Sequence, residues 1–246
     1  ISPFAKKAIE KSLIDIERYP DGNGFYLKRA ISKKYKLQSS EIILGNGSND
    51  VLELVARTFL SKNDEAIYSE HAFAVYPLVV KAVGAKGIEV PAVNFAHNLD
   101  GFQKAITNKT KVIFIANPNN PTGTLIGKIE IRNFLNNIPA NIVVVLDEAY
   151  DEYLTEEHKS EAFSWLSTFE NLIISRSFSK AYGLAGLRVG FGVGSSSLIE
   201  IMNRIRQPFN VNYLAQQAAI ASLDDDDFIQ LSKKINSQGI KPVSYT

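Results

Sequence analysis

Two uninterrupted apolar runs constrain the fold of this chain more than any other feature. Residues Ile113–Ile115 and Ile142–Leu146 are apolar at every position, without the polar–apolar alternation of a half-exposed strand. Strands with this pattern are buried on both faces, which is typical of parallel sheets that carry helices on each side. The two runs therefore predict the centre of a sheet covered by two helical layers.

Strand patterns alternate with helix patterns up to about residue 193, and helix patterns alone follow. The predicted strands are Glu41–Leu44, Ala66–Ser69, Gly87–Pro91, Lys111–Asn117, Ile142–Asp147, Asn171–Ser175 and Arg188–Val193. The predicted helices are Asn49–Leu60, Ala74–Val83, Leu99–Thr107, Lys128–Asn136, Ser197–Arg206, Val211–Leu223 and Phe228–Asn236, with an amphipathic helix near the N-terminus. This order predicts an α/β fold, a three-layer αβα sandwich with a mostly parallel central sheet. Residues 241–246 are expected to be extended.

Composition excludes several classes of function. The chain has no cysteine, which excludes disulfides, thiolate metal sites and a cysteine nucleophile, and its three histidines lack ligand spacing, so no metal is expected. The net charge of +1 implies no nucleic-acid partner, and no apolar run is long enough to cross a membrane. The N-terminus lacks the pattern of a signal peptide, so we expect a cytoplasmic protein. The acidic tract Asp224–Asp227 is interpreted as the start of a helix rather than a metal site.

Polar motifs follow the predicted strands, where ligands collect in open α/β sheets. These motifs are Gly45–Asp50, His71–Tyr76, Asn117–Gly123, Asp147–Tyr150 and Ser177–Lys180, and Arg188 follows the last of them. Each has an ordinary interpretation when taken alone. A lysine is usually a surface charge, an aspartate after a strand is often a helix cap, aromatic rings pack, and asparagine, proline and glycine form turns.

Taken together, an amine, a carboxylate, a phenol, an amide, hydroxyls and a guanidinium match the needs of one cofactor, pyridoxal 5′-phosphate (PLP). The amine of Lys180 would form a Schiff base, and we expect this side chain to be buried beside cations that lower its pKa. The carboxylate of Asp147 would hold the pyridinium proton. Asn120 and Tyr150 would contact the phenolic oxygen, and Phe73 would lie on the ring face. The phosphate would be held by Ser48, Ser177, Ser179 and Arg188.

The motifs resemble those of the fold type I PLP-dependent aminotransferases, most closely the histidinol-phosphate aminotransferase family. The resemblance covers essentially the whole chain and is carried, in the family's order, by Arg18–Asp21, Gly45–Asn49, Glu70–Tyr76, Pro118–Gly123, Asp147–Tyr150 and Ser177–Arg188. It implies catalytic roles for Lys180, Asp147 and Tyr150, and it adds Asn49 to the phosphate shell. It also implies a homodimer in which Tyr19 reaches the phosphate of the neighbouring subunit.

The resemblance implies reversible amino transfer between small amino-acid and keto substrates, from glutamate to imidazole-acetol phosphate, in histidine biosynthesis. Three alternatives stay open: a transaminase for aromatic amino acids, a lyase similar to threonine-phosphate decarboxylase, and a PLP-binding fragment without turnover.

The sequence departs from the family's pattern in two ways. Asn49-Asp50 stands where the family carries Asp-Glu, and we expect phosphate binding to survive because backbone N–H groups do most of the work there. The family also extends beyond both ends of this chain, so we expect a truncated chain that lacks the arginine for a substrate carboxylate. The expected parts are an N-terminal helix and turn (1–24), a PLP-binding large domain (25–226) and the start of an incomplete small domain (227–246).

Overall fold

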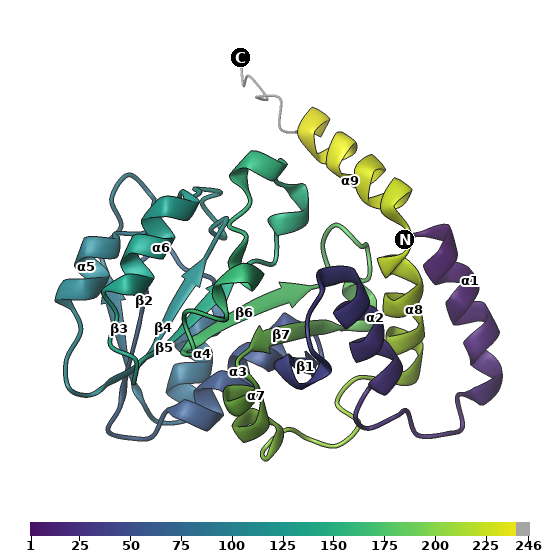
Figure 1. Cartoon of the computed structure of the whole chain (residues 1–246), viewed down its shortest axis with the longest axis horizontal. Coiled ribbons are helices and arrows are strands. Elements are labelled where there is room, and N and C mark those ends of the chain that lie inside the picture. Colours follow the sequence, from purple (N-terminus) through teal and green to yellow (C-terminus); the bar gives the residue numbers. More distant parts are fainter. Residues whose placement is uncertain (240–246) are drawn as a thin grey trace.

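Seven strands form one sheet in the spatial order β1-β7-β6-β5-β4-β2-β3 (Figure 1). The computed structural model describes residues 1–239, and the segment 241–246, expected to be extended, lies outside this range. Among the described residues, β7 runs in the direction opposite to the other six strands, so the prediction of a mostly parallel sheet is confirmed. The strands are β1 Ile42–Gly45, β2 Glu65–Ser69, β3 Lys86–Val90, β4 Thr110–Ala116, β5 Val143–Asp147, β6 Leu172–Ser177 and β7 Gly190–Gly194.

Helices cover both faces of this sheet, which confirms the three-layer architecture. They are α1 Pro3–Ser12, α2 Phe25–Tyr35, α3 Ser48–Phe59, α4 Val75–Ala82, α5 Leu99–Lys104, α6 Lys128–Asn136, α7 Ser196–Asn203, α8 Tyr213–Leu223 and α9 Asp226–Gly239, with short 3₁₀ turns between some of them. Side chains of α3, α4 and α7 form the core on one face, and those of α2, α5, α6 and α8 form the core on the other.

The central strands show why their sequences lack alternation. In β4, Ile113 and Ile115 pack into one core while Val112 and Phe114 pack into the other. The valines of β5 divide between the two cores in the same way. Successive side chains of a strand point to opposite faces, so a strand buried on both faces needs an apolar residue at every position.

One helix was not predicted and one strand boundary was wrong. No helix was expected between residues 25 and 35, yet α2 is present and buries Leu27 and Ile31, which lie one turn apart on one side of the helix. The strand predicted from Arg188 begins only at Gly190, because Arg188 has a φ of 55° and lies in the left-handed region. A backbone turned in this way cannot continue a strand.

The N-terminus lies beside the start of α9. Helix α1 packs along α8, and the hydroxyl of Ser2 at its start donates to the carboxylate of Asp225. Asp225 also accepts the backbone N–H of Phe228 at 3.1 Å, which caps the α9 helix that leads away from the body in Figure 1. The acidic tract therefore begins a helix as predicted, although Asp225 itself is buried. The assignment of α9 to a second domain stays a prediction.

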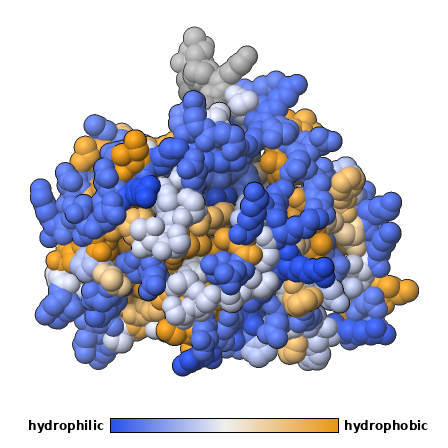
Figure 2. Space-filling view, in the orientation of Figure 1, coloured by the Kyte–Doolittle hydropathy of each residue, from blue (hydrophilic) through white to orange (hydrophobic). Residues whose placement is uncertain are grey.

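The surface carries no large apolar region on the face seen in Figure 2, where hydrophobic side chains form small patches among hydrophilic ones. Among residues 1–239, we find no helix with the length and apolar character needed to cross a bilayer.

Candidate active site

One pocket of about 190 Å³ lies at the carboxyl ends of β4, β5 and β6. Its lining contains ten of the eleven predicted site residues: Ser48, Asn49, Phe73, Asn120, Asp147, Tyr150, Ser177, Ser179, Lys180 and Arg188. Parallel strands end at the same edge of a sheet, so motifs far apart in the sequence meet there. Tyr19 lies outside this pocket, with 84% of its surface exposed and its ring centroid 4.9 Å from that of Phe209.

The start of α3 forms one end of the pocket. Gly47, with a φ of 80°, turns the chain from β1 into the helix, and a Cβ at this position would collide with the guanidinium of Arg188. No side chain within residues 1–239 caps the helix, so its first N–H groups remain available. A helix start with free N–H groups attracts anions.

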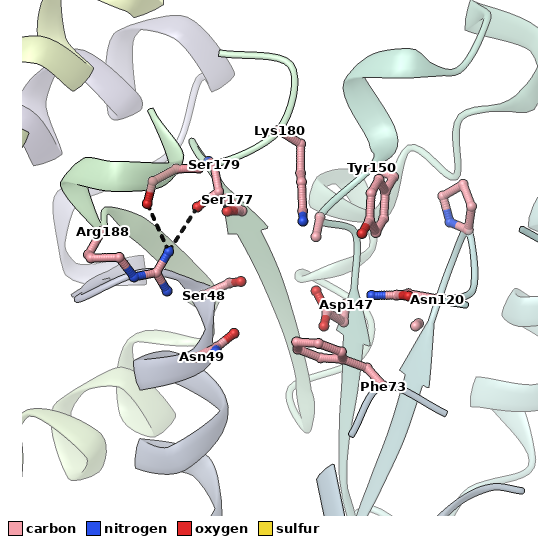
Figure 3. Close-up of a pocket in the computed structure, with 14 residues that line it drawn as sticks. Ser48, Asn49, Phe73, Asn120, Asp147, Tyr150, Ser177, Ser179, Lys180 and Arg188 are labelled. Atoms are coloured by element: carbon pink, nitrogen blue, oxygen red, sulfur yellow. Dashed lines mark hydrogen bonds between the residues drawn. The ribbon is translucent and has the colours of Figure 1, made fainter. Parts of the chain in front are cut away.

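Hydroxyl and guanidinium groups converge on the same end (Figure 3). The left-handed turn at Arg188 directs its side chain toward the pocket, where Nη1 donates to the carbonyl of Ala185 at 3.1 Å and to Ser179 Oγ at 3.4 Å. The backbone N–H of Ser179 in turn donates to Ser177 Oγ at 3.0 Å. Together with the α3 N-terminus, these groups form a cradle suited to a phosphate.

The glycines of β7 explain why α3 lies so close to this cradle. A Cβ on Gly190 would lie 2.5 Å from the backbone nitrogen of Ser48, and one on Gly192 would lie 2.7 Å from Val51 Cγ1. The interpretation of this glycine-rich strand as a close-packing surface is therefore confirmed.

Asp147 forms the opposite end of the pocket. Its side chain is buried, and Oδ2 accepts a hydrogen bond from the hydroxyl of Tyr76 at 2.9 Å. Burial raises the pKa of Asp147 to about 6, and the hydrogen bond from Tyr76 opposes this rise. Its other oxygen, Oδ1, is buried and finds no hydrogen-bond partner among the described residues. Buried acceptors are normally satisfied, so Oδ1 is suited to a donor on a ligand.

Four further side chains surround the space between these two ends. Figure 3 shows Phe73, Asn120, Tyr150 and Lys180 around one opening beside Asp147. The Nζ atom of Lys180 lies 5.2 Å from the centroid of the Tyr150 ring. Lys180 is exposed at the rim, so the expectation that this amine is buried was wrong.

Two residues of the predicted motifs hold the pocket loops, a role that was not predicted for them. Asp50 Oδ2 accepts the backbone N–H of Asn46 at 2.9 Å and the amide of Asn210 at 2.7 Å, so it closes the loop before α3. Asn119 donates to the carbonyl of His71 at 2.7 Å, which joins two neighbouring strand ends. An acidic residue at the third position of a helix is typical of a capping arrangement and could have indicated Asp50, whereas no local pattern indicates the contact made by Asn119.

A buried ionic cluster behind the pocket was also missed. The guanidinium of Arg176 lies 2.7 Å from Glu148, 2.8 Å from Asp151 and 3.2 Å from Glu152, and all four side chains are buried. Burial raises the pKa of Glu148 to about 7, although Arg176 opposes the rise. A charged residue inside the fully buried strand β6 was the available signal.

This cluster is connected to the pocket through the chain. Glu148, Asp151 and Arg176 directly follow or precede Asp147, Tyr150 and Ser177, which line the pocket. One guanidinium therefore ties the segment after β5 to the end of β6. The resulting pocket can bind a ligand with an anion at one end, a proton-bearing group at the other and an amine-reactive carbon near Lys180.

The comparisons with known proteins agree with this geometry. Residues 2–242 match the family described as aminotransferase class I and II. A histidinol-phosphate aminotransferase of Methylobacillus flagellatus is 58% identical over 99% of this chain and 66% of its own length, so the chain spans just under two thirds of that relative.

Two solved structures share the fold. The histidinol-phosphate aminotransferase of Sinorhizobium meliloti, solved in complex with pyridoxal-5′-phosphate, has a TM-score of 0.92 and 26% identity, covering 97% of this chain and 65% of its own. The L-threonine-O-3-phosphate decarboxylase of Porphyromonas gingivalis has a TM-score of 0.83 and 25% identity, covering 96% of this chain and 73% of its own.

Proposed function

Because the chain belongs to the class I and II aminotransferase family, we propose that its pocket binds PLP and serves a transaminase that forms histidinol phosphate. The amino donor would be glutamate and the acceptor imidazole-acetol phosphate. The observation that carries this proposal is the meeting of ten predicted residues in one pocket, with an amine between an anion cradle and a carboxylate. The name of the relative at 58% identity supports the choice of substrate.

The residues present fit PLP at both ends of the pocket. The Oδ1 of Asp147, which has no hydrogen-bond partner among the described residues, can accept a hydrogen bond from a protonated pyridine nitrogen. The uncapped start of α3 and the guanidinium of Arg188 offer donors to a phosphate.

We assign the following roles on this basis. The phosphate would be held by Ser48, Asn49, Ser177, Ser179 and Arg188. Asn120 and Tyr150 would hold the phenolic oxygen, and Phe73 would lie against the ring face, where an offset stack contributes about 0.5–1.5 kcal/mol. When bound, PLP supplies an electron-withdrawing ring that stabilises negative charge at the α-carbon of the substrate.

Lys180 would have two tasks. Its amine would carry the cofactor through the aldehyde carbon, and once a substrate amine displaces it, the freed amine would move a proton at the substrate's α-carbon. Lys180 is the one primary amine among the lining residues, and its position at the rim leaves it accessible to an incoming substrate. Asp147 would keep the ring nitrogen protonated throughout.

A lyase is the second candidate, because the fold also matches L-threonine-O-3-phosphate decarboxylase with a TM-score of 0.83. Incubating the purified chain and PLP with glutamate and imidazole-acetol phosphate, or separately with O-phosphothreonine, distinguishes the two. Formation of 2-oxoglutarate supports the transaminase, and release of carbon dioxide supports the lyase. PLP binding without either product supports the fragment without turnover.

Cofactor binding is tested apart from turnover. We expect added PLP to give a visible or near-ultraviolet absorbance band that borohydride removes, and we expect Lys180→Ala to lack it. Lys104→Ala, at an exposed position of α5, serves as the matched control and should keep the band. A band of unchanged intensity in Lys180→Ala would contradict the assignment.

We further propose a homodimer in which Tyr19 reaches the phosphate of the partner's site. Its 84% exposure supports this, and so do the exposed apolar side chains of Ile14, Ile16, Phe25 and Tyr26 nearby in the sequence. Light scattering should give the mass of two chains, and Tyr19→Phe should weaken PLP binding without changing that mass. The proposal would be refuted if the wild-type chain were a monomer and bound PLP with the same affinity as the Tyr19→Phe variant.

A further inference from the structure

The hydroxyl of Tyr76 donates to Oδ2 of Asp147 at 2.9 Å, and this hydrogen bond lowers the pKa of the carboxyl more than the contributions of the Ala149 backbone and the Ser175 side chain do. Tyr76 lies in the first turn of α4, the helix that follows the loop carrying Phe73, and its side chain is fully buried. The bond joins residues 71 positions apart in the chain, so it forms only when α4 packs on the sheet.

Packing fixes the ring of Tyr76 on two sides. It stacks on Phe114 of β4 with the centroids 4.9 Å apart and an interplanar angle of 9°. Phe73 meets it edge-on, with the centroids 6.0 Å apart and an angle of 90°. A ring held between two others cannot move its hydroxyl appreciably, so the position of the oxygen bonded to it is also fixed.

We propose that Tyr76 is a positioning residue for Asp147: by occupying Oδ2, it presents the unpartnered Oδ1 as the acceptor for a protonated ring nitrogen and keeps the carboxylate charged. This inference deepens the proposed function and rests on PLP binding in the pocket. The terminal torsion of a carboxylate has only weak preferences of its own, so the hydrogen bond from Tyr76 helps to set its orientation.

The charge of Asp147 depends on the same hydrogen bond. Burial of Asp147 favours its neutral form, and a neutral carboxyl cannot pair with a protonated nitrogen. A hydrogen bond donated to the ionised carboxylate favours the charged form and so opposes this effect of burial. Tyr76 is a reliable donor because burial, together with the neighbouring Asp147, raises the pKa of its own hydroxyl well above the ordinary value.

The variant Tyr76→Phe removes the hydroxyl and keeps the ring that packs between Phe73 and Phe114. We expect PLP to bind about 10- to 100-fold more weakly at pH 7, since a hydrogen bond to a charged group is lost. We also expect the acid-side midpoint of binding, measured as the PLP dissociation constant from pH 5 to pH 9, to rise by about one pH unit.

Tyr182→Phe is the matched control. Tyr182 is buried, its hydroxyl lies 3.1 Å from that of Tyr35, and it does not line the pocket. Tyr182→Phe should unfold at a lower urea concentration than the wild type. Its affinity for PLP and its acid-side midpoint of PLP binding should stay at the wild-type values. In an Asp147→Asn background, Tyr76→Phe should have little further effect on PLP binding, because the charge that the hydroxyl stabilises is gone.

The outcomes separate this inference from the function on which it rests. Failure of the wild-type chain to bind PLP would overturn the proposed function. Wild-type binding with an unchanged affinity and midpoint in Tyr76→Phe would overturn this inference alone. Equal losses of affinity in Tyr76→Phe and Tyr182→Phe would also overturn it, because a general packing defect would then explain both.

Discussion

Replacement of Arg176 by methionine should destabilise the protein strongly and in a pH-dependent way. The guanidinium is surrounded by three buried carboxylates, and methionine keeps much of the side-chain length without the charge. Removing one partner of a buried ion pair costs about 3–5 kcal/mol, because the remaining charge stays buried without compensation. We expect a loss of this size in the free energy of unfolding near pH 8.

The loss should be smaller at pH 5. Burial raises the pKa of Glu148 from 4.5 to about 7 even with Arg176 present. A carboxyl with a raised pKa binds its proton more tightly in the folded state, so its contribution is favourable below its unfolded pKa and is lost as the pH rises through the folded pKa. Without Arg176 the pKa of Glu148 rises further. At pH 5 Glu148 therefore stays protonated in the folded state, and the cost of a buried charge without a partner does not arise.

Urea unfolding followed by the emission of Trp165, the chain's one tryptophan and a core residue, measures this difference. Arg204→Met is the matched control, because Arg204 pairs with Glu200 at 2.9 Å on the surface, with about 70% of each side chain exposed. Its loss should be about 0–1 kcal/mol at either pH. An equal loss for Arg176→Met at pH 5 and pH 8 would refute the reasoning, since lost packing rather than uncompensated charge would then dominate.

Three more results are expected. Gly190→Ala should lower the free energy of unfolding by about 1–3 kcal/mol and weaken PLP binding, because its Cβ would displace the start of α3, whereas Gly186→Ala has open space and should be nearly neutral in urea unfolding. Asp50→Ala should cost about 0.5–2 kcal/mol in the same assay, since it removes the acceptor that closes the loop before α3, and an unchanged midpoint would contradict this role. PLP affinity should fall as the pH drops through about 6, where Asp147 becomes neutral, and a titration that stays flat down to pH 5 would argue against the pairing.

Much of the architecture could be predicted from local patterns. The apolar runs in β4 and β5 indicated strands buried on both faces, and the alternation with helices indicated a mostly parallel sheet. Motifs placed after such strands had to meet at one edge, which is why ten predicted site residues line one pocket. The helix α2 was missed, although Leu27 and Ile31 carry its spacing, because its remaining positions are rich in charged and exposed residues.

The chain's order of residues thus determined which chemical groups meet, because strand direction carries each motif to a known edge of the sheet. Packing alone decided how those groups are held. The hydrogen bond from Tyr76 to Asp147, the burial of Arg176 among acidic residues and the exposure of Lys180 depend on side chains brought together from distant segments. Periodicity and motif spacing describe neighbours along the chain, whereas charge states and orientations follow from neighbours in space.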